Sequence, residues 1–360
     1  MRLKRRIFIE FILPFALLSF CATVTRAEVE AESGTPHLYQ TPAEKREIAG
    51  IVLREGISMG GLIEVEASAG REQGENVSDV VLATFELGVE AELSKWLRGR
   101  ALLLWEEDDT EPVELDEAVV VIGGSAEVPF YLEAGKMYVP FGTFSSHFIS
   151  DPLVLELAET RESAIIAGYA NDWVDIRAGA FNGDVDKEED KTDELVAALT
   201  FDLGDWFQSG GYWISHIGES DLLEESLNEN GNSRETAAPE FSGVQGAGGF
   251  VSLRVGRLVA DAEYAAALED FAAGTIGPSP ARPVAWNAEA GLYFHGKQAE
   301  IALKFEGSDE LPGFPEKQYG IGSSIKIVES VTVAIEFLHG DFRENDEDRD
   351  IVTTQLALEF

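Results

Sequence analysis

Apolar and polar side chains alternate along much of the chain from Met59 to Phe360. Residues 79–93 are the clearest example, with an apolar face of Val81, Ala83, Phe85, Leu87, Val89, Ala91 and Leu93. Because successive side chains of a strand point to opposite sides, this pattern predicts β-strands with one apolar and one polar face. Residues 284–294 and 298–306 repeat it. Soluble β-sandwiches also alternate, so the pattern does not by itself determine the architecture.

The lengths of the connections distinguish the two architectures. Links such as 94–95 and 295–297 are short, whereas links such as 69–78, 106–114 and 144–160 are longer and polar, and the two kinds alternate. Each segment has roughly the 10 residues that a tilted membrane strand needs, and alternating short turns and long loops are typical of membrane barrels. We therefore predict an all-β fold, a transmembrane antiparallel β-barrel of about 16 strands over residues 59–360.

The last ten residues, Ile351–Phe360, alternate in the same way and end on an aromatic side chain. Such an ending is typical of a terminal barrel strand, and we expect the barrel-assembly machinery to recognise it. A closed wall leaves no free edge. We therefore expect this run to be the sixteenth strand and to pair with the first strand near Gly61–Ala67.

The first 27 residues have the features of a cleaved secretory signal. Basic residues precede an apolar run from Ile7 to Phe20, and small residues approach Ala27, after which we expect cleavage. A membrane anchor is the alternative, although the run is shorter than the about 20 residues of a spanning helix. The single cysteine, Cys21, is compatible with a lipoprotein, in which a lipid is attached to this residue. The bulky Phe20 argues against it, because lipid attachment requires a small residue before the cysteine.

Residues 28–58 lie between the expected signal and the expected barrel. We predict a short periplasmic segment, because this length is too small for a globular plug. Ile48, Ile51 and Val52 have helical spacing, so Thr41–Glu55 is predicted as a short helix, with a strand as the alternative.

The chain is strongly acidic, with 27 basic and 66 acidic residues and a net charge of −39. Without the first 27 residues, 22 basic and 65 acidic residues remain, and the net charge is −43. Such a chain repels nucleic acid, which we exclude as a partner. Acid-rich chains are often disordered, but the hydrophobic content of 45% favours a folded protein.

A barrel of sixteen strands encloses an aqueous channel, so transport across the outer membrane of a Gram-negative bacterium is the leading function class. Acids outnumber bases on the polar faces, so an open pore should favour cations. Many of these charges could instead pair across neighbouring strands. The side chains expected to line the lumen include Glu86, Glu90, Arg98, Arg100, Glu289, Glu300, Lys304 and Glu336.

Several blocks of the sequence resemble the LbtU-type siderophore porins. They are GLIEVEA (61–67), LLWEEDD (103–109), YLEAGKMYVPFG (131–142), ISDPLVLELAETRES (149–163) and FNGD (181–184). The resemblance extends over most of the mature chain, and the fourth block is the most specific. It implies an outer-membrane protein that takes ferric siderophore into the periplasm without a plug; it does not identify the siderophore. Some members carry a coiled-coil segment before the barrel, and this chain has nothing of comparable length there.

The connection from Phe141 to Arg161 is the best candidate for a selective element. It mixes aromatic and aliphatic residues with polar ones, whereas an external loop would be more polar. We expect it to fold into the lumen and narrow the pore, with Asp151, Glu156, Glu159 and Arg161 at the constriction. A loop packed on the barrel rim is the alternative.

Other chemistries have weaker support. His147, His216, His295 and His339 lie on different segments, and no two have metal-ligand spacing, so we predict no metal site and no cofactor. Ser145, Ser146 and His147 are adjacent, but adjacent residues point apart and no third member of a triad is evident, so we predict no enzyme. The expected partners are outer-membrane lipid and lipopolysaccharide, ferric siderophore and the assembly machinery. A diffusion porin without a siderophore site is the alternative function, and a homotrimer is one form to test.

Overall fold

The computed structural model describes residues 51–72, 74–107, 112–125, 128–183, 185, 192–232, 243–343 and 348–360. The expected signal peptide, its cleavage site and residues 28–50 of the expected periplasmic segment lie outside these residues.

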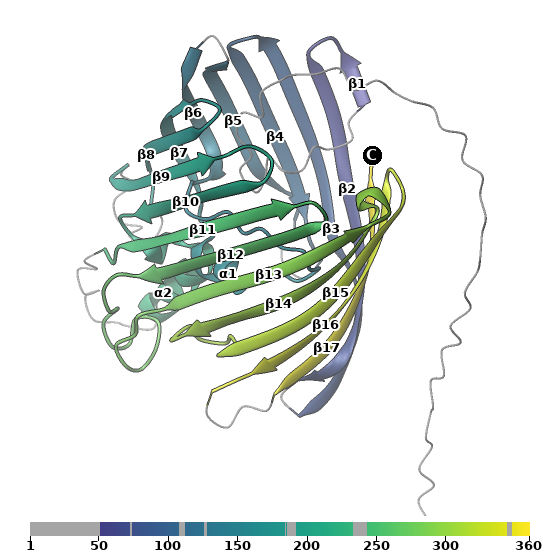
Figure 1. Ribbon diagram of the computed structural model, residues 1–360. Helices are drawn as coiled ribbons and strands as arrows, with labels where there is room; N and C mark the ends of the chain where they lie inside the picture. Colours follow the sequence, from purple (N-terminus) through teal and green to yellow (C-terminus); the bar gives the residue numbers. More distant parts are fainter. Residues whose placement is uncertain are drawn as a thin grey trace, which may run out of the picture. The chain divides into compact units, whose positions relative to one another are not determined.

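The described chain is almost entirely β-structure (Figure 1). The strands are β1 (Ile51–Arg54), β2 (Ile57–Glu72), β3 (Glu75–Ser94), β4 (Leu97–Trp105), β5 (Glu114–Ser125), β6 (Val128–Tyr138), β7 (Arg161–Ala170), β8 (Val174–Phe181), β9 (Glu194–Asp202), β10 (Phe207–Ile214), β11 (Gly246–Val255), β12 (Leu258–Ala267), β13 (Val284–Phe294), β14 (Ala299–Asp309), β15 (Lys317–Val328), β16 (Val331–Asp341) and β17 (Arg349–Glu359). The helices are α1 (Leu153–Ala158), η1 (Ile217–Glu219), α2 (Asp221–Asn232) and η2 (His295–Lys297). No helix in this part of the chain has the length and apolar character needed to cross a membrane.

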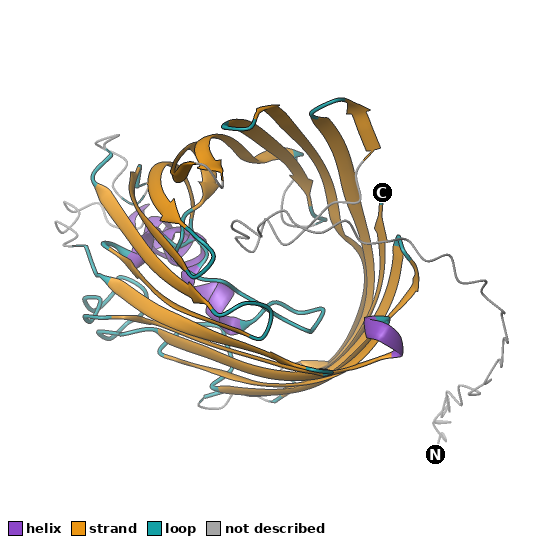
Figure 2. Ribbon diagram, turned by 45° about the horizontal axis from the view of Figure 1, so that its top comes forward, coloured by secondary structure: helices purple, strands orange, loops and turns teal. Residues whose placement is uncertain are grey.

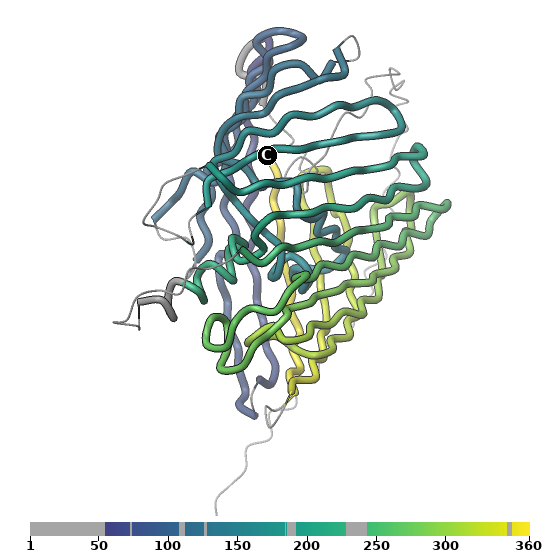
Figure 3. Tube along the Cα trace, turned by 90° about the vertical axis from the view of Figure 1, so that its left-hand side faces the viewer, coloured from purple at the N-terminus to yellow at the C-terminus, as the bar shows by residue number. Residues whose placement is uncertain are grey.

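Within the described residues, strands β2–β17 form a closed antiparallel barrel of sixteen strands. Each strand pairs with the next along the chain, and neighbouring strands run side by side in opposite directions (Figure 3). β17 closes the ring by pairing with β2, from Glu359 opposite Leu62 to Asp350 opposite Arg71. The predicted fold class, strand number and pairing of the last strand with the first are therefore confirmed.

The two faces of the wall differ in exposure, as the alternating sequence predicts. On β14, Leu303 and Phe305 are 59% and 41% exposed, whereas Lys304 and Glu306 are 3% and 0% exposed. Apolar side chains of this strand therefore face outward, and charged side chains face the interior. An apolar outer surface is what a barrel presents to lipid.

Two predictions about the start of the barrel are wrong. Residues 51–54 of the expected helix form strand β1, because Gly56, with φ of +75°, reverses the chain and lets β1 pair with the start of β2. Residues 69–78 are mostly strand, since β2 extends to Glu72 and β3 begins at Glu75. Their polar composition suggested a loop, but strand pairing outside a membrane does not require apolar residues. β1 occupies the same edge of β2 as β17, before Leu62, so the ring still has sixteen strands.

The seam between β17 and β2 requires a glycine at position 61. Gly61 and Phe360 exchange two backbone hydrogen bonds of 2.8 and 3.0 Å. A Cβ atom at Gly61 would lie 2.7 Å from the carbonyl oxygen of Glu86 and 2.6 Å from the Phe360 ring. We expect Gly61→Ala to lower the free energy of unfolding by roughly 1–3 kcal/mol, because backbone atoms must move to admit the methyl group.

Urea unfolding in detergent measures this effect, and Gly99→Ala is the matched control. A Cβ atom at Gly99 meets its nearest neighbour, the Val119 carbonyl oxygen, at 3.6 Å, which is ordinary contact. We expect the control to change stability by less than about 0.5 kcal/mol. Equal stabilities of the two variants would contradict the close packing of the seam.

Candidate functional site

The connection between β6 and β7, residues 139–160, lies inside the barrel. Figure 2 shows this loop and its short helix α1 within the ring of strands. Its hydrogen-bond partners are on β12, β13, β14 and β16. β14 is eight strands from β6 around the ring of sixteen. The loop therefore crosses the lumen and is attached to the opposite wall.

Backbone amides fix the loop in this position. Those of Thr143, Phe144, His147, Ile149, Ser150 and Leu153 donate to carboxylates at N···O distances of 2.6–3.1 Å. The acceptors, here called the anchor glutamates, are Glu263 on β12, Glu289 on β13, Glu306 on β14 and Glu336 on β16. All four are at most 7% exposed. A buried carboxylate is costly without hydrogen bonds, so wall and loop stabilise each other.

His147 holds the centre of the loop between two further carboxylates. Its Nδ1 lies 2.8 Å from Glu300 Oε1, and its Nε2 lies 2.8 Å from Asp261 Oδ2. Both ring nitrogens can donate only when the imidazole is protonated. Burial disfavours the charged ring, but the hydrogen bonds to Asp261 and Glu300 outweigh it and raise the pKa of His147 to about 9. His147 is therefore a cation at neutral pH.

Lys304 supplies a second positive charge beneath the loop. Its Nζ donates to the carbonyl oxygen of Ser150 at 3.0 Å and lies 3.5 Å from carboxylate oxygens of both Glu289 and Glu306. It also lies 5.0 Å from the centre of the Phe148 ring. This arrangement balances part of the charge of the anchor glutamates.

The second half of the loop fills the barrel with apolar side chains. Leu153, Val154 and Leu157 of α1 are at most 3% exposed and belong to a buried cluster with Phe181 and Leu223. α1 contacts β12, β13, β14 and α2. This half of the loop is therefore packed against the barrel wall, and its buried side chains leave the first half to line the cavity described next.

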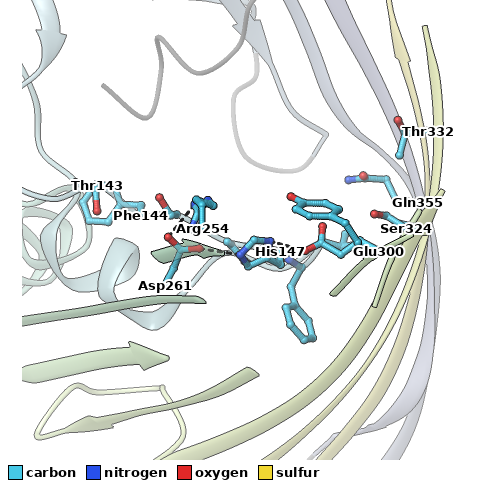
Figure 4. Close-up of a pocket in the computed structure, with 15 residues that line it drawn as sticks. Thr143, Phe144, His147, Arg254, Asp261, Glu300, Ser324, Thr332 and Gln355 are labelled. Atoms are coloured by element: carbon cyan, nitrogen blue, oxygen red, sulfur yellow. Dashed lines mark hydrogen bonds and ion pairs between the residues drawn. The ribbon is translucent and has the colours of Figure 1, made fainter. Parts of the chain in front are cut away.

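A cavity of about 440 Å³ lies beside that first half (Figure 4). Residues 143–149 form one side of it. The barrel wall supplies the rest, with Arg254, Asp261, Tyr293, Glu300, Ser324, Thr332, Ala334 and Gln355. Arg254 pairs with Asp261 at 3.0 Å, so the cavity has two cationic side chains, Arg254 and His147, close to the same carboxylate. Its remaining lining is mostly hydroxyl and amide groups.

The four residues predicted at the constriction lie in the second half of the loop or just after it. Asp151 is exposed, Glu156 is in the first turn of α1, and Glu159 ends that helix. Arg161 begins β7, and its Nη1 lies 2.5 Å from Glu114 and from Asp116 on β5. Asp151, Glu159 and Arg161 interact electrostatically, beside Asp116 and Asp221. The cavity is lined by the earlier half of the loop.

The residues predicted to line the lumen fall into two groups. Glu289, Glu300, Lys304 and Glu336 all contact the loop. Glu86 is 3% exposed. Glu90, Arg98 and Arg100 border a second cavity of about 400 Å³ next to the β1–β2 turn. Arg100 also pairs with Glu117 at 3.2 Å, as expected for charges that pair across neighbouring strands.

Sequence reasoning missed Asp261 and Glu263, which hold His147 and the start of the loop. The alternating pattern could have identified them, because both acidic residues alternate with alanine along β12 in the segment VADAEYA. Glu263 accepts hydrogen bonds from the backbone and hydroxyl of Thr143, the backbone of Phe144 and the hydroxyl of Tyr212. Contacts between the loop after β6 and a strand six places further around the ring could not be inferred from alternation.

The geometry around Ser146 and His147 does not form a nucleophile and base. The hydroxyl of Ser146 donates to Glu289 at 3.0 Å, while Asp261 and Glu300 occupy both ring nitrogens of His147. A protonated ring held in this way cannot accept a proton from serine.

Two groups of described side chains could hold a metal ion. They are Glu194, His216 and Glu219, and His339, Asp341 and Asp348. The prediction of no metal site rested on the spacing between histidines. Such spacing does not reveal a histidine whose neighbours in the folded protein are carboxylates.

The carboxyl group of Glu159 gives a testable dependence of stability on pH. Burial, with the nearby charges of Asp221, Asp151 and Asp116, raises its pKa from 4.5 to about 9 against the effect of Arg161. The folded chain therefore retains a proton that the unfolded chain releases, and stability falls as the pH rises from 4.5 to about 9. We expect Glu159→Gln to match the wild type near the lower pH and to be increasingly more stable toward the upper one.

Urea unfolding at several pH values measures this difference. Glu225→Gln, on the exposed side of α2, is the control and should follow the wild-type pH profile. A Glu159→Gln variant whose stability relative to the wild type does not depend on pH would show that Glu159 is ionised in the folded chain.

No protein-family model matches the chain. It is 27% identical to a UPF0422 protein of Coxiella burnetii in an alignment of 278 positions that covers 71% of this chain and 57% of that protein. It is 25% identical to a UPF0422 protein of Legionella pneumophila in an alignment of 297 positions that covers 72% of this chain and 54% of that protein. The chain spans about half the length of the curated relatives it matches.

Solved structures with a similar fold are porins and outer-membrane channels. The anion-selective porin from Comamonas acidovorans has a TM-score of 0.62 and 11% identity, over 84% of this chain and 99% of that one. The channel DcaP of Acinetobacter baumannii has a TM-score of 0.59 and 12% identity, over 87% and 100%. The fold is that of an outer-membrane porin.

Proposed function

We propose that the protein is an outer-membrane diffusion channel whose selectivity is set by the loop 139–160, and that its cargo is a ferric siderophore. The observation that carries the channel function is the attachment of this loop to the opposite wall by six backbone hydrogen bonds. A loop held in this way narrows the lumen without closing it, because the cavity beside its first half remains.

The charge balance around the loop supports a preference for cations. The described wall side chains that contact the loop include six carboxylates, which are the four anchor glutamates, Asp261 and Glu300. The positive charges close to these carboxylates are His147 of the loop and Lys304 and Arg254 of the wall. The net negative charge favours entry of cations and of neutral solutes over anions.

The siderophore part of the proposal rests on where the resemblance falls. The most specific block that resembles the siderophore porins is residues 149–163, and the structure has residues 149–160 of it inside the barrel. The block therefore forms the second half of the loop that lies in the lumen, directly after the residues 143–149 that line the cavity. A diffusion porin without a siderophore site remains the second candidate, because the solved structures of similar fold are porins.

Liposome swelling tests the two candidates. Protein reconstituted into liposomes is exposed to neutral sugars, amines and ferric siderophores of several chemical classes. A siderophore channel should admit one iron complex faster than sugars of similar size, and excess of that complex should slow the entry of sugars. Entry rates governed by size alone, without competition, would refute the siderophore site while leaving the channel function in place.

The remaining parts of this proposal concern how the protein reaches the membrane. They are a signal peptide cleaved after Ala27, recognition of the C-terminal strand by the barrel-assembly machinery, contact with lipopolysaccharide, and a homotrimer. The pairing of Gly61 with Phe360 supports a role of the last strand in closing the barrel. N-terminal sequencing of protein purified from outer membranes tests the cleavage site directly.

A further inference from the structure

Three side chains from two segments of the chain converge at the bases of the connections between β8 and β9 and between β10 and β11. Glu194 begins β9, His216 immediately precedes η1, and Glu219 ends η1. His216 Nδ1 lies 3.3 Å from Glu219 Oε1 and 4.0 Å from Glu194 Oε1. One nitrogen and two carboxylate oxygens therefore face the same small space.

A second layer of hydrogen bonds orients these carboxylates. The hydroxyl of Ser215 donates to Glu194 Oε2, and the backbone amide of Val185 donates to Glu219 Oε2 at 3.1 Å. The Oε2 atom of each carboxylate is thus occupied, and each Oε1 atom is directed toward His216. Metal sites characteristically have such an outer layer, because it holds the ligands in place before the ion binds.

The surrounding backbone leaves room only because two neighbouring residues are glycines. A Cβ atom at Gly183 would lie 2.6 Å from Glu219 Oε1, and one at Gly218 would lie 2.9 Å from His216 Nε2. His216 and Glu219 are 5% and 3% exposed, whereas the side chain of Glu194 is 20% exposed. The site is enclosed on the side of His216 and Glu219 and accessible from the side of Glu194.

We propose that Glu194, His216 and Glu219 bind a divalent first-row transition metal ion of the Zn²⁺ type. One imidazole nitrogen with two carboxylate oxygens is a donor set that zinc accepts, with water in the fourth position. Donors about 2.1 Å from a tetrahedral ion are about 3.4 Å apart. The distance from His216 Nδ1 to Glu219 Oε1, 3.3 Å, matches this value, and that to Glu194 Oε1, 4.0 Å, requires the more exposed Glu194 side chain to move slightly inward. Calcium is disfavoured, because it prefers oxygen ligands alone.

A bound ion would join two of the long connections at their bases. Glu194 follows the connection between β8 and β9, and His216 and Glu219 lie in the connection between β10 and β11. Binding to the folded state alone raises stability by mass action. The ion would therefore fasten the mouth of the barrel without entering the path beside the loop 139–160.

Isothermal titration calorimetry with ZnCl₂ tests this proposal on full-length protein refolded in detergent and treated with chelator. We expect one zinc ion per chain. His216→Ala and Glu219→Gln should each weaken zinc binding at least about tenfold, since each removes a ligand. His339→Ala is the matched control, because His339 is also close to carboxylates but its side chain is 35% exposed, and this variant should bind zinc like the wild type.

Glu194→Gln decides the question if the buried variants fail to fold, because Glu194 is the most exposed of the three ligands. Circular dichroism establishes which variants are folded. A wild type that takes up no zinc, a folded Glu194→Gln variant with unchanged affinity, or loss of binding in His339→Ala would each overturn the proposal. Anomalous diffraction at the zinc edge should place the ion between Glu194, His216 and Glu219.

Discussion

Replacing Ser146–Ala158 by a short glycine-serine bridge is expected to raise the single-channel conductance at least about twofold, because a barrel of sixteen strands is a wide aqueous pore once the loop is removed. The deleted residues include the donors to Glu289, Glu306 and Glu336 and the apolar face of α1. Both the constriction and the packed half of the lumen disappear together. Planar-bilayer recordings in potassium chloride measure the change.

Deletion of Pro278–Pro280 is the control for this experiment. These residues are exposed in the connection between β12 and β13, so their loss should leave the conductance unchanged. Circular dichroism of both proteins shows whether the barrel has formed. A folded deletion of Ser146–Ala158 with wild-type conductance would mean that the loop does not limit the pore.

Removing the positive charge of His147 is expected to alter ion selectivity and stability together. In His147→Asn, Asp261 and Glu300 lose a cationic neighbour, so the permeability ratio of potassium to chloride should rise roughly twofold or more. The pKa of His147 is raised from 6.5 to about 9, so its contribution to stability is complete below pH 6.5 and is lost as the pH rises through about 9. At neutral pH the variant should be less stable by about 3 kcal/mol at most.

Reversal potentials across a potassium chloride gradient and urea unfolding at several pH values measure these two effects. His295→Ala, in the exposed turn after β13, is the control and should change neither. The wild type itself should become more cation-selective above pH 9, as the ring loses its proton. A variant with wild-type reversal potential would place His147 outside the ion path.

The periodicity of single strands predicted the barrel well, because lipid and lumen impose opposite requirements on alternate side chains. Glu289, Glu300, Lys304 and Glu336 were predicted to be inside from parity alone, and all four contact the loop. The errors at residues 51–54 and 69–78 occurred where the chain has a polar or ambiguous pattern. In these two segments, backbone hydrogen bonds to the adjacent strand determine the structure, and the amino-acid composition does not reveal such bonds.

The wall residues that bind the loop could not be predicted, because they contact it from distant parts of the chain. The loop was correctly placed inside the barrel from its mixed composition, yet its partners on β12–β16 follow more than a hundred residues later. His216 illustrates the same limit, because its carboxylate neighbour Glu194 precedes it by a whole strand pair. Such pairings depend on barrel closure, a property of the complete ring rather than of any segment.

The attachment of the loop through main-chain amides has a consequence for how such channels diversify. Any residue except proline can supply the amide that an anchor glutamate accepts. Where only the amide makes this contact, as at Ile149, the side chain can vary while the path of the loop stays constant, whereas Thr143, Ser146 and His147 also bind the wall through their side chains. New cargo preferences could arise through point mutations in this stretch, with the scaffold inherited unchanged.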